Sequence, residues 1–199
     1  MGAGKMKRNA KTVSPESNEG RNQYVVNQIT QALLQLMEDG PIGNISISQV
    51  CTQAQVGRAS FYRNFESKED VIRKHLKALS DQWTKRHENI AQEDLVEALF
   101  SHYYEHRALF LLLYHQGLAY MSLENLKESC GPKPEHTNLV AYTTAFISYG
   151  IYGWIEEWFF RGLQESPKEM AQLCLEAHQA GMQQISKNSA NQPEAFAHV

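Results

Sequence analysis

The densest group of side chains able to contact a nucleic acid lies between residues 46 and 68, in the sequence SISQVCTQAQVGRASFYRNFESK. Arg58 can bind a guanine edge or a phosphate, and Ser60, Tyr62 and Asn64 offer hydroxyl and amide groups to phosphates or base edges. Lys68 can share a phosphate with the backbone amides at the start of the helix that follows. These residue types and spacings predict a helix that enters the DNA major groove while its flanks bind phosphates.

Two short helices and a turn are needed to present these side chains. Residues 48–54 suit a first short helix, with Ser46 placed to cap it. Residues 55–57 form the turn, in which we expect Gly57 to take a backbone conformation that other residues resist. Residues 58–64 then form the second helix, and Phe61 and Phe65, four positions apart, face inward. The apolar set that packs these helices comprises Ile45, Ile47, Val50, Ala54, Val56, Phe61 and Phe65.

The remaining pattern is helical. Apolar residues recur at three- and four-residue steps from Tyr24 to Met37, and Asp39-Gly40-Pro41 ends that helix. Ser67 caps a long helix that runs to about His87. Further helices are expected near residues 92–104, 106–116, 119–129, 136–162 and 167–186. The sequence therefore predicts an all-α fold of about nine helices.

Residues 56–71, VGRASFYRNFESKEDV, resemble the recognition-helix signature of TetR/AcrR-family repressors. In that family a valine and a small residue precede Tyr-x-x-Phe and then Ser-Lys-Glu. The resemblance extends back through Ser46 to about Arg21, roughly a quarter of the chain. Ala59 stands where many relatives carry glycine, and Phe61 where leucine is common. The resemblance implies DNA contacts by Ser46, Ser48, Arg58, Ala59, Ser60, Tyr62, Asn64 and Lys68.

We expect five segments along the chain. Residues 1–20 form a disordered basic tail, 21–66 a helix-turn-helix DNA-binding domain, and 67–88 a connecting helix. Residues 89–186 form a ligand-binding and dimerisation domain, and 187–199 a second disordered tail. Charge follows this division: residues 1–90 hold 13 Lys/Arg against 9 Asp/Glu, whereas residues 91–199 hold 6 against 13. A basic N-terminal part and an acidic C-terminal part fit a DNA-binding domain joined to a domain that does not bind DNA.

The run AYTTAFISYGIYGWIEEWFFRGLQESPKEMAQLCLEAH resembles the last two long helices of the family, which bundle with their copies in a partner subunit. A helix that is apolar nearly all round must be covered on both sides, which favours an interface. A homodimer would also place two reading helices one DNA turn apart, about 34–36 Å. The expected interface residues are Tyr149, Gly150, Gly153, Trp154, Cys174 and His178.

A small-molecule effector of unknown identity is expected to bind among the middle helices. The candidate lining residues are aromatic residues and one histidine, although aromatic residues at helical spacing more often belong to a core than to a ligand site. They are Tyr103, Phe110, Tyr114, His115, Tyr120, Tyr142 and Phe146.

Amino-acid composition limits the cellular compartments in which the protein is expected. Cys51, Cys130 and Cys174 are odd in number and far apart, which indicates reduced, mostly buried thiols in a cytoplasm. No stretch approaches the roughly 20 apolar residues of a membrane helix, and the start lacks a secretory signal. We expect no membrane association and no cofactor or metal.

The sequence thus predicts a transcriptional regulator, most simply a repressor that binds a palindromic operator as a homodimer and is released by an effector. One alternative is a ligand-independent, DNA-bound scaffold that recruits another protein. Another is a small metal hydrolase, since His102, Glu105 and His106 match the H-x-x-E-H pattern of some zinc proteases. That reading lacks a third ligand and a substrate cleft.

Overall fold

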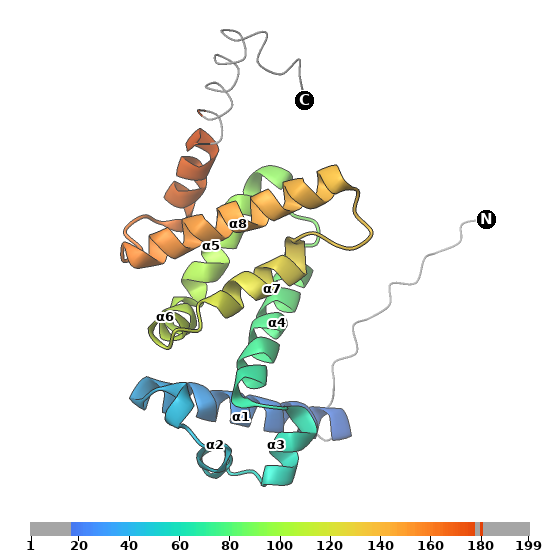
Figure 1. Cartoon of the computed structure of the whole chain (residues 1–199), viewed down its shortest axis with the longest axis vertical. Coiled ribbons are helices and arrows are strands. Elements are labelled where there is room, and N and C mark those ends of the chain that lie inside the picture. The colour runs from blue at the N-terminus through green and yellow to red at the C-terminus, as the bar shows by residue number, and fades with distance from the viewer. Residues whose placement is uncertain (1–16, 178–179, 181–199) are drawn as a thin grey trace, which may run out of the picture. The chain divides into compact units, whose positions relative to one another are not determined.

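The computed structural model describes residues 17–177 and 180, and every regular element among them is helical (Figure 1). The all-α prediction is confirmed. Eight α-helices and two short 3-10 turns are followed by a helical segment that starts at residue 167. The elements are α1 (Asn18–Asp39), η1 (Ile42–Asn44), α2 (Ile47–Gln53), α3 (Arg58–Asn64), α4 (Lys68–Arg86), η2 (Gln92–Asp94), α5 (Leu95–Glu105), α6 (Arg107–His115), α7 (Tyr120–Cys130) and α8 (Asn138–Phe160).

Helix α1 begins earlier than the apolar pattern predicted. The Ser17 hydroxyl accepts a hydrogen bond from the Gly20 amide at 2.9 Å, so the helix starts at Asn18. Residues 18–20 are therefore helical and do not belong to the predicted tail. Residues 1–16 of that tail and the whole of the predicted tail at 187–199 lie outside the described residues.

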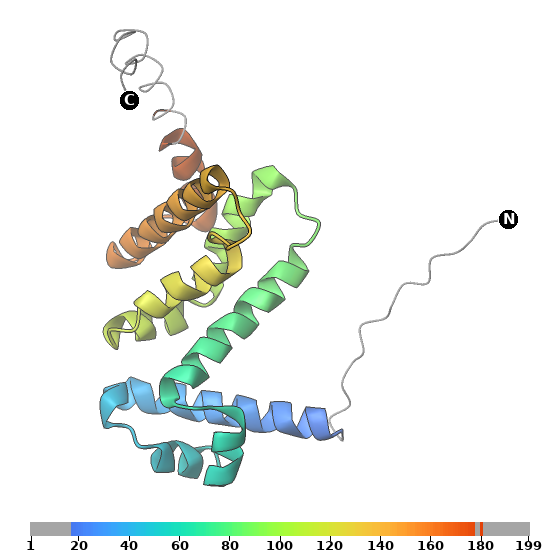
Figure 2. The ribbon, with the colours of Figure 1, turned by 45° about the vertical axis from the view of Figure 1, so that its right-hand side comes forward.

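The described residues fall into two compact units that divide between His75 and Leu76. In the first unit, α2 and α3 pack on α1, and both ribbon views show them on one side of it (Figures 1 and 2). The core of this unit is almost wholly aliphatic apart from the rings of Phe61 and Phe65. It consists chiefly of Ile29, Leu33, Val50, Phe61, Val71 and Ile72.

The turn between α2 and α3 corrects one prediction. Gly57 has an ordinary extended conformation at φ −74°, where it caps the start of α3, and the left-handed residue is Gln55 at φ +54°. The Val56 amide donates to the Cys51 carbonyl at 3.0 Å, a bond that closes the end of α2 only if the residue before Val56 is left-handed. The need for positive φ therefore falls on Gln55.

Helix α4 begins as expected and continues across the division between the units. The Ser67 hydroxyl accepts from the Asp70 amide at 3.1 Å, and Glu69 and Asp70 lie in the first turn, where the helix dipole favours acids. The helix ends at Arg86, one residue before the predicted end at about His87.

The second unit is built from the end of α4 and helices α5 to α8. Its most buried large side chains are Phe100, Leu113, Met121 and Trp158, and Phe100 meets Trp158 edge-on with ring centroids 5.6 Å apart. Helix α7 packs along α8, and α5 packs on α6 (Figure 1). None of the described helices is long and apolar enough to cross a membrane.

Candidate functional site

Helix α3 presents a polar outer face held by an apolar inner one. Arg58, Ala59 and Tyr62 are exposed, and the Tyr62 side chain is 58% accessible. Phe61 and Phe65, on the opposite side, are 0% and 2% accessible. Because two buried rings hold a seven-residue helix to the unit, the outward direction of Arg58 and Tyr62 is set by the core.

Arg58 and Ser48 form one exposed polar pair. The Arg58 guanidinium donates from Nη2 to the Ser48 hydroxyl oxygen at 2.6 Å, joining the start of α3 to the first turn of α2. A guanidinium has five N–H donors, so one bond to a hydroxyl leaves most of its donor capacity for a base edge or a phosphate. Both remain candidates for DNA contact.

The other predicted polar residues differ in how far their side chains are already engaged. Ser46 and Gln49 form a capping box, in which the Ser46 hydroxyl accepts from the Gln49 amide and the Gln49 side chain accepts from the Ser46 amide. The Asn64 side-chain amide donates to the Ser60 carbonyl at 2.9 Å, and both residues are half-buried. Their DNA contacts stay predictions that would compete with these bonds.

Lys68 has a structural role that the sequence reading missed. Its ammonium donates to the Ile42 and Ile45 carbonyl oxygens, each at 2.5 Å, and so ties the start of α4 to the η1 turn. A carbonyl oxygen has two lone pairs, so Ile42 can accept this bond and the backbone bond from Ile45 together. The predicted phosphate contact would have to compete with both bonds.

A polar groove of about 410 Å³ continues the surface of α3 onto α1. Arg21 and Arg63 stand on its two sides, from α1 and α3 respectively. The groove brings α1 into the candidate nucleic-acid surface, which sequence reasoning confined to residues 46–68. The other lining residues are Asn18, Asn22, Val25, Ser60 and Asn64.

The second unit contains a cavity of about 280 Å³ between α4, α5, α7 and α8. Its walls are mostly aliphatic and aromatic, with a few hydroxyl, amide, imidazole and thiol groups. The principal lining residues are Leu76, Leu79, Trp83, Leu99, Leu126, Ile147 and Ile151, together with the polar Ser80, His102 and Asn125. Leucines and isoleucines at helical spacing look the same whether they line a cavity or fill a core, so the sequence contained no signal for most of them.

The predicted effector residues separate into three groups. Tyr103 and Phe110 line the cavity, with ring centroids 4.5 Å apart. Tyr114 lines only a smaller neighbouring pocket. Tyr142 and Phe146 are 71% and 78% accessible, and with His115 and Tyr120 they line neither space. Because α8 is apolar on nearly every face, its sequence could not tell which aromatic residues face inward.

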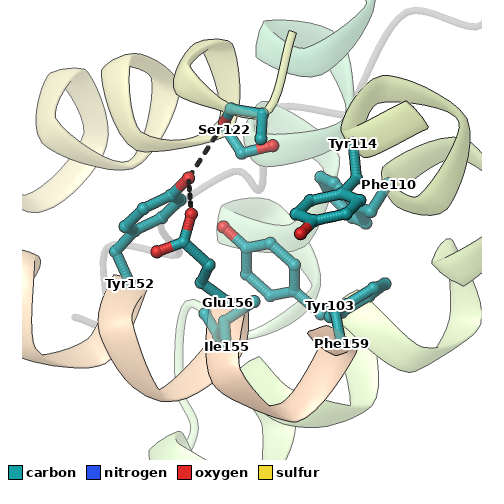
Figure 3. A pocket seen from close by; sticks show the side chains of 9 residues that line it. Tyr103, Phe110, Tyr114, Ser122, Tyr152, Ile155, Glu156 and Phe159 are labelled. Atoms are coloured by element: carbon teal, nitrogen blue, oxygen red, sulfur yellow. Dashed lines mark hydrogen bonds between the residues drawn. The ribbon is translucent and has the colours of Figure 1, made fainter. Parts of the chain in front are cut away.

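The neighbouring pocket has a volume of about 30 Å³, room for about one water molecule. Tyr103 is one of its lining residues, and the Tyr152 hydroxyl lies 3.3 Å from both the Ala119 carbonyl oxygen and the Glu156 carboxylate, either of which can accept its single proton (Figure 3). Burial raises the pKa of Tyr103, and burial and then the Glu156 charge raise that of Tyr152 to about 12. The size of this space excludes it as an effector site.

His102 combines a half-buried position with a lowered pKa. Burial, and after it the neighbouring His106, lowers its pKa to about 4, while Glu105 opposes the shift. Glu105 also pairs with Arg86 at 3.4 Å, and the His102 and His106 rings lie 4.9 Å apart. Within residues 17–177 no group of three or more His, Cys, Asp or Glu side chains could hold a metal ion.

Four of the six predicted dimer residues line a groove of about 460 Å³ beside α8. Tyr149, Gly150, Gly153 and Trp154 all line it, and Tyr149 is 51% accessible. Cys174 is half-buried, and His178 lies outside the described residues. The prediction of mostly buried thiols is wrong, since only Cys51 is buried and Cys130 is exposed.

Two family models match the chain. One, described as bacterial regulatory proteins of the tetR family, matches residues 29–74, which contain α2 and α3. The other, described as a transcriptional regulator C-terminal region, matches residues 91–178. No curated protein matches the chain. The two matches follow one another along the chain and cover most of its described part, and neither describes an enzyme. The chain belongs to the TetR family of transcriptional regulators and carries its helix-turn-helix DNA-binding region.

Proposed function

We propose that the protein is a repressor that binds a palindromic operator as a homodimer in the cytoplasm and leaves it when a small molecule occupies the second unit. The DNA-binding part of this proposal rests on the exposed polar face of α3. Arg58, Ala59 and Tyr62 are exposed there, while Phe61 and Phe65 hold the helix from behind. Arg58 would read a base edge, Ala59 would allow close approach, and Tyr62 would bind a phosphate.

An exposed apolar stripe on α8 supports the homodimer. Leu139, Tyr142, Phe146 and Tyr149 recur at three- and four-residue steps and are 51–78% accessible. Gly153 continues the stripe, and an added Cβ there would meet no atom within 4 Å. Exposed apolar patches of this kind mark interaction sites, and glycine permits a second helix to approach closely. A second copy of the same helix is the occupant we propose.

The cavity of the second unit supports effector release over a ligand-independent scaffold. A scaffold needs no internal space, whereas a cavity of about 280 Å³ costs packing energy and can be retained for a ligand. The effector would favour a dimer geometry in which both α3 helices cannot enter adjacent major grooves. A differential affinity of about 3 kcal/mol would change occupancy more than a hundredfold.

Sequence-specific DNA binding can be tested by selecting, from a random pool of duplexes, those that the full-length protein binds. We expect enrichment of a palindrome whose half-sites lie about one helical turn apart, occupied by two chains. Tyr62→Ala should weaken binding to all duplexes by about tenfold, and Arg58→Ala should also change the selected sequence. Tyr120→Ala is the matched control, because Tyr120 is similarly exposed but lies on α7 in the second unit.

A protein that showed no preference for any duplex over random DNA would contradict sequence-specific regulation. A selected site without two-fold symmetry, or one chain per duplex, would contradict the homodimer alone. Placing the selected site across a reporter promoter then separates repression from activation, since occupancy there must lower transcription if the protein is a repressor.

A further inference from the structure

The cavity of the second unit has no formal charge on its walls. Among the residues that the structure describes, no Asp, Glu, Lys or Arg lines it. Burial raises the pKa of Tyr103, and partial desolvation of the thiol raises that of Cys130, a residue that is otherwise exposed, so both of these lining groups are neutral near pH 7. The cavity therefore offers no fixed counter-ion to a charged ligand.

His102 is the one other lining group that could become charged near neutral pH. Burial, and then His106, Arg86 and His87, lower its pKa to about 4, and the opposing Glu105 carboxylate does not restore it. The imidazole is therefore neutral in the cavity and presents one N–H donor and one lone pair. Without a ligand it therefore carries no positive charge that could attract a carboxylate or phosphate.

The remaining polar groups on the wall are neutral hydrogen-bonding groups. The Asn125 side-chain amide donates to the Ser80 hydroxyl at 2.6 Å, which joins α7 to α4 and leaves the Asn125 carbonyl oxygen and the Ser80 O–H for a ligand. The Trp83 indole N–H donates to the Ala98 carbonyl at 3.2 Å, so Trp83 offers a ligand mainly its ring.

From this lining we propose that the effector is an electrically neutral, largely apolar small molecule with at least one hydrogen-bonding group, recognised by His102 and the Asn125–Ser80 pair. Moving an unpaired ion from water into such a space is strongly unfavourable, whereas a hydroxyl or amide can replace its water bonds on these groups. The volume lies at the lower end of ligand pockets, which favours one compact ring system or a short chain. This inference deepens the proposed effector release and rests on it.

Three probes that share one skeleton test the role of charge. They are naphthalen-2-ylmethanol, naphthalene-2-carboxylate and naphthalen-2-ylmethylammonium, titrated calorimetrically into the full-length protein at pH 7.5. We expect the alcohol to bind at one site per chain and at least about tenfold more tightly than either ion. Binding of either ion as tight as that of the alcohol, or no saturable binding of the alcohol, would overturn the proposal.

Two substitutions locate the binding. Leu99→Trp should fill the cavity and abolish binding of the alcohol, whereas Glu97→Ala, at an exposed position of the same helix, should leave it unchanged. If Leu99→Trp does not fold, Val96→Phe serves as a milder filling variant on the same wall. His102→Phe should weaken the alcohol by about fivefold while 2-methylnaphthalene binds as before, since only the alcohol can use the imidazole. Alcohol binding that persists in the filled variants would place the site elsewhere and refute the assignment.

DNA release is measured separately, with the selected operator and the same probes. If the alcohol binds the cavity but operator binding is unchanged, the ligand class stands and the proposed release fails. If a charged compound releases the operator and Leu99→Trp blocks that release, the release stands and the ligand class fails.

Discussion

At the residue scale, two cations of the first unit, Arg58 and Lys68, have different roles. Arg58 points outward and donates one hydrogen bond to the Ser48 hydroxyl, so its other N–H groups remain able to bind DNA. Lys68 is half-buried and gives its ammonium to two backbone carbonyls of the unit itself. Arg58 and Lys68 are both cations at the start of a helix. They differ in role because backbone carbonyl oxygens lie within reach of Lys68, whereas Arg58 bonds a side-chain hydroxyl.

Replacing Lys68 with methionine should destabilise the first unit even without DNA. The variant keeps most of the aliphatic stem but loses two charge-assisted hydrogen bonds, which we expect to lower the free energy of unfolding by about 1–2 kcal/mol. Urea denaturation followed by circular dichroism measures the change. Arg73→Met is the control, because Arg73 is exposed on the same helix. Equal midpoints for the two variants would show that the carbonyl bonds contribute nothing.

His102 should make the protein sensitive to mild acid. Its pKa is 6.5 in the unfolded chain and about 4 in the folded one, so between these values the unfolded state binds the extra proton. Stability is therefore fully present above pH 6.5 and falls as the pH drops toward 4, by on the order of 2 kcal/mol after allowing for partial exposure. Chemical denaturation across this range measures the slope.

The matched variants are His102→Gln, which cannot titrate, and His115→Gln on the exposed end of α6. The first should flatten the dependence between pH 6.5 and 4, and the second should leave it intact. An unchanged slope in His102→Gln would mean that other groups cause the acid sensitivity.

At the element scale, the turn between α2 and α3 stores strain at Gln55. A non-glycine residue at φ +54° brings its Cβ close to backbone atoms, at a cost of about 1–2 kcal/mol. Gln55→Gly should remove this cost and raise the free energy of unfolding by about 0.5–1 kcal/mol, since glycine loses more entropy on folding. Gln55→Ala keeps a Cβ and should give no comparable gain. Thermal unfolding compares the three proteins, and a gain from alanine equal to that from glycine would disprove the strain.

Helix α8 illustrates how one element can serve two surfaces. Ile147 and Ile151 line the cavity, while Leu139, Tyr142, Phe146 and Tyr149 form the exposed stripe. A ligand in the cavity and a partner on the stripe would therefore contact the same helix, which is a physical route for coupling effector binding to dimer geometry.

At the scale of the whole molecule, a substitution at Gly153 should affect the stability of the single chain and its self-association in opposite directions. In the single chain an added Cβ meets nothing within 4 Å, so Gly153→Leu should stabilise α8 by up to about 1 kcal/mol through helix propensity. In the proposed dimer the same side chain would hold the two helices apart and weaken self-association by about tenfold or more.

Sedimentation velocity over a range of protein concentrations, alongside thermal unfolding, measures both effects. Glu124→Leu, at an exposed site on α7, controls for the added apolar surface. A dimer unaffected by Gly153→Leu would exclude close approach of the helices at this position, whatever the stability of the chain.

Features that depend on neighbours a few residues apart were predictable from the chain. The periodic apolar residues, the caps at Ser46 and Ser67 and the inward pair Phe61 and Phe65 were all read correctly, and so was the all-helical class. A cap or a helical face involves residues within one turn of each other, so the order of residue types alone specifies it. The family resemblance rested on these same local signals.

Tertiary structure decided whatever depends on residues far apart in the chain. The capture of Lys68 by the carbonyls of Ile42 and Ile45 spans more than twenty residues. The division of α8 into a cavity side and an exposed stripe depends on which helices pack against it, and the neutrality of His102 depends on burial between helices. Apolar periodicity identifies faces but not what covers them, so only the packed chain determines that a cavity lies between these helices and that its walls are uncharged.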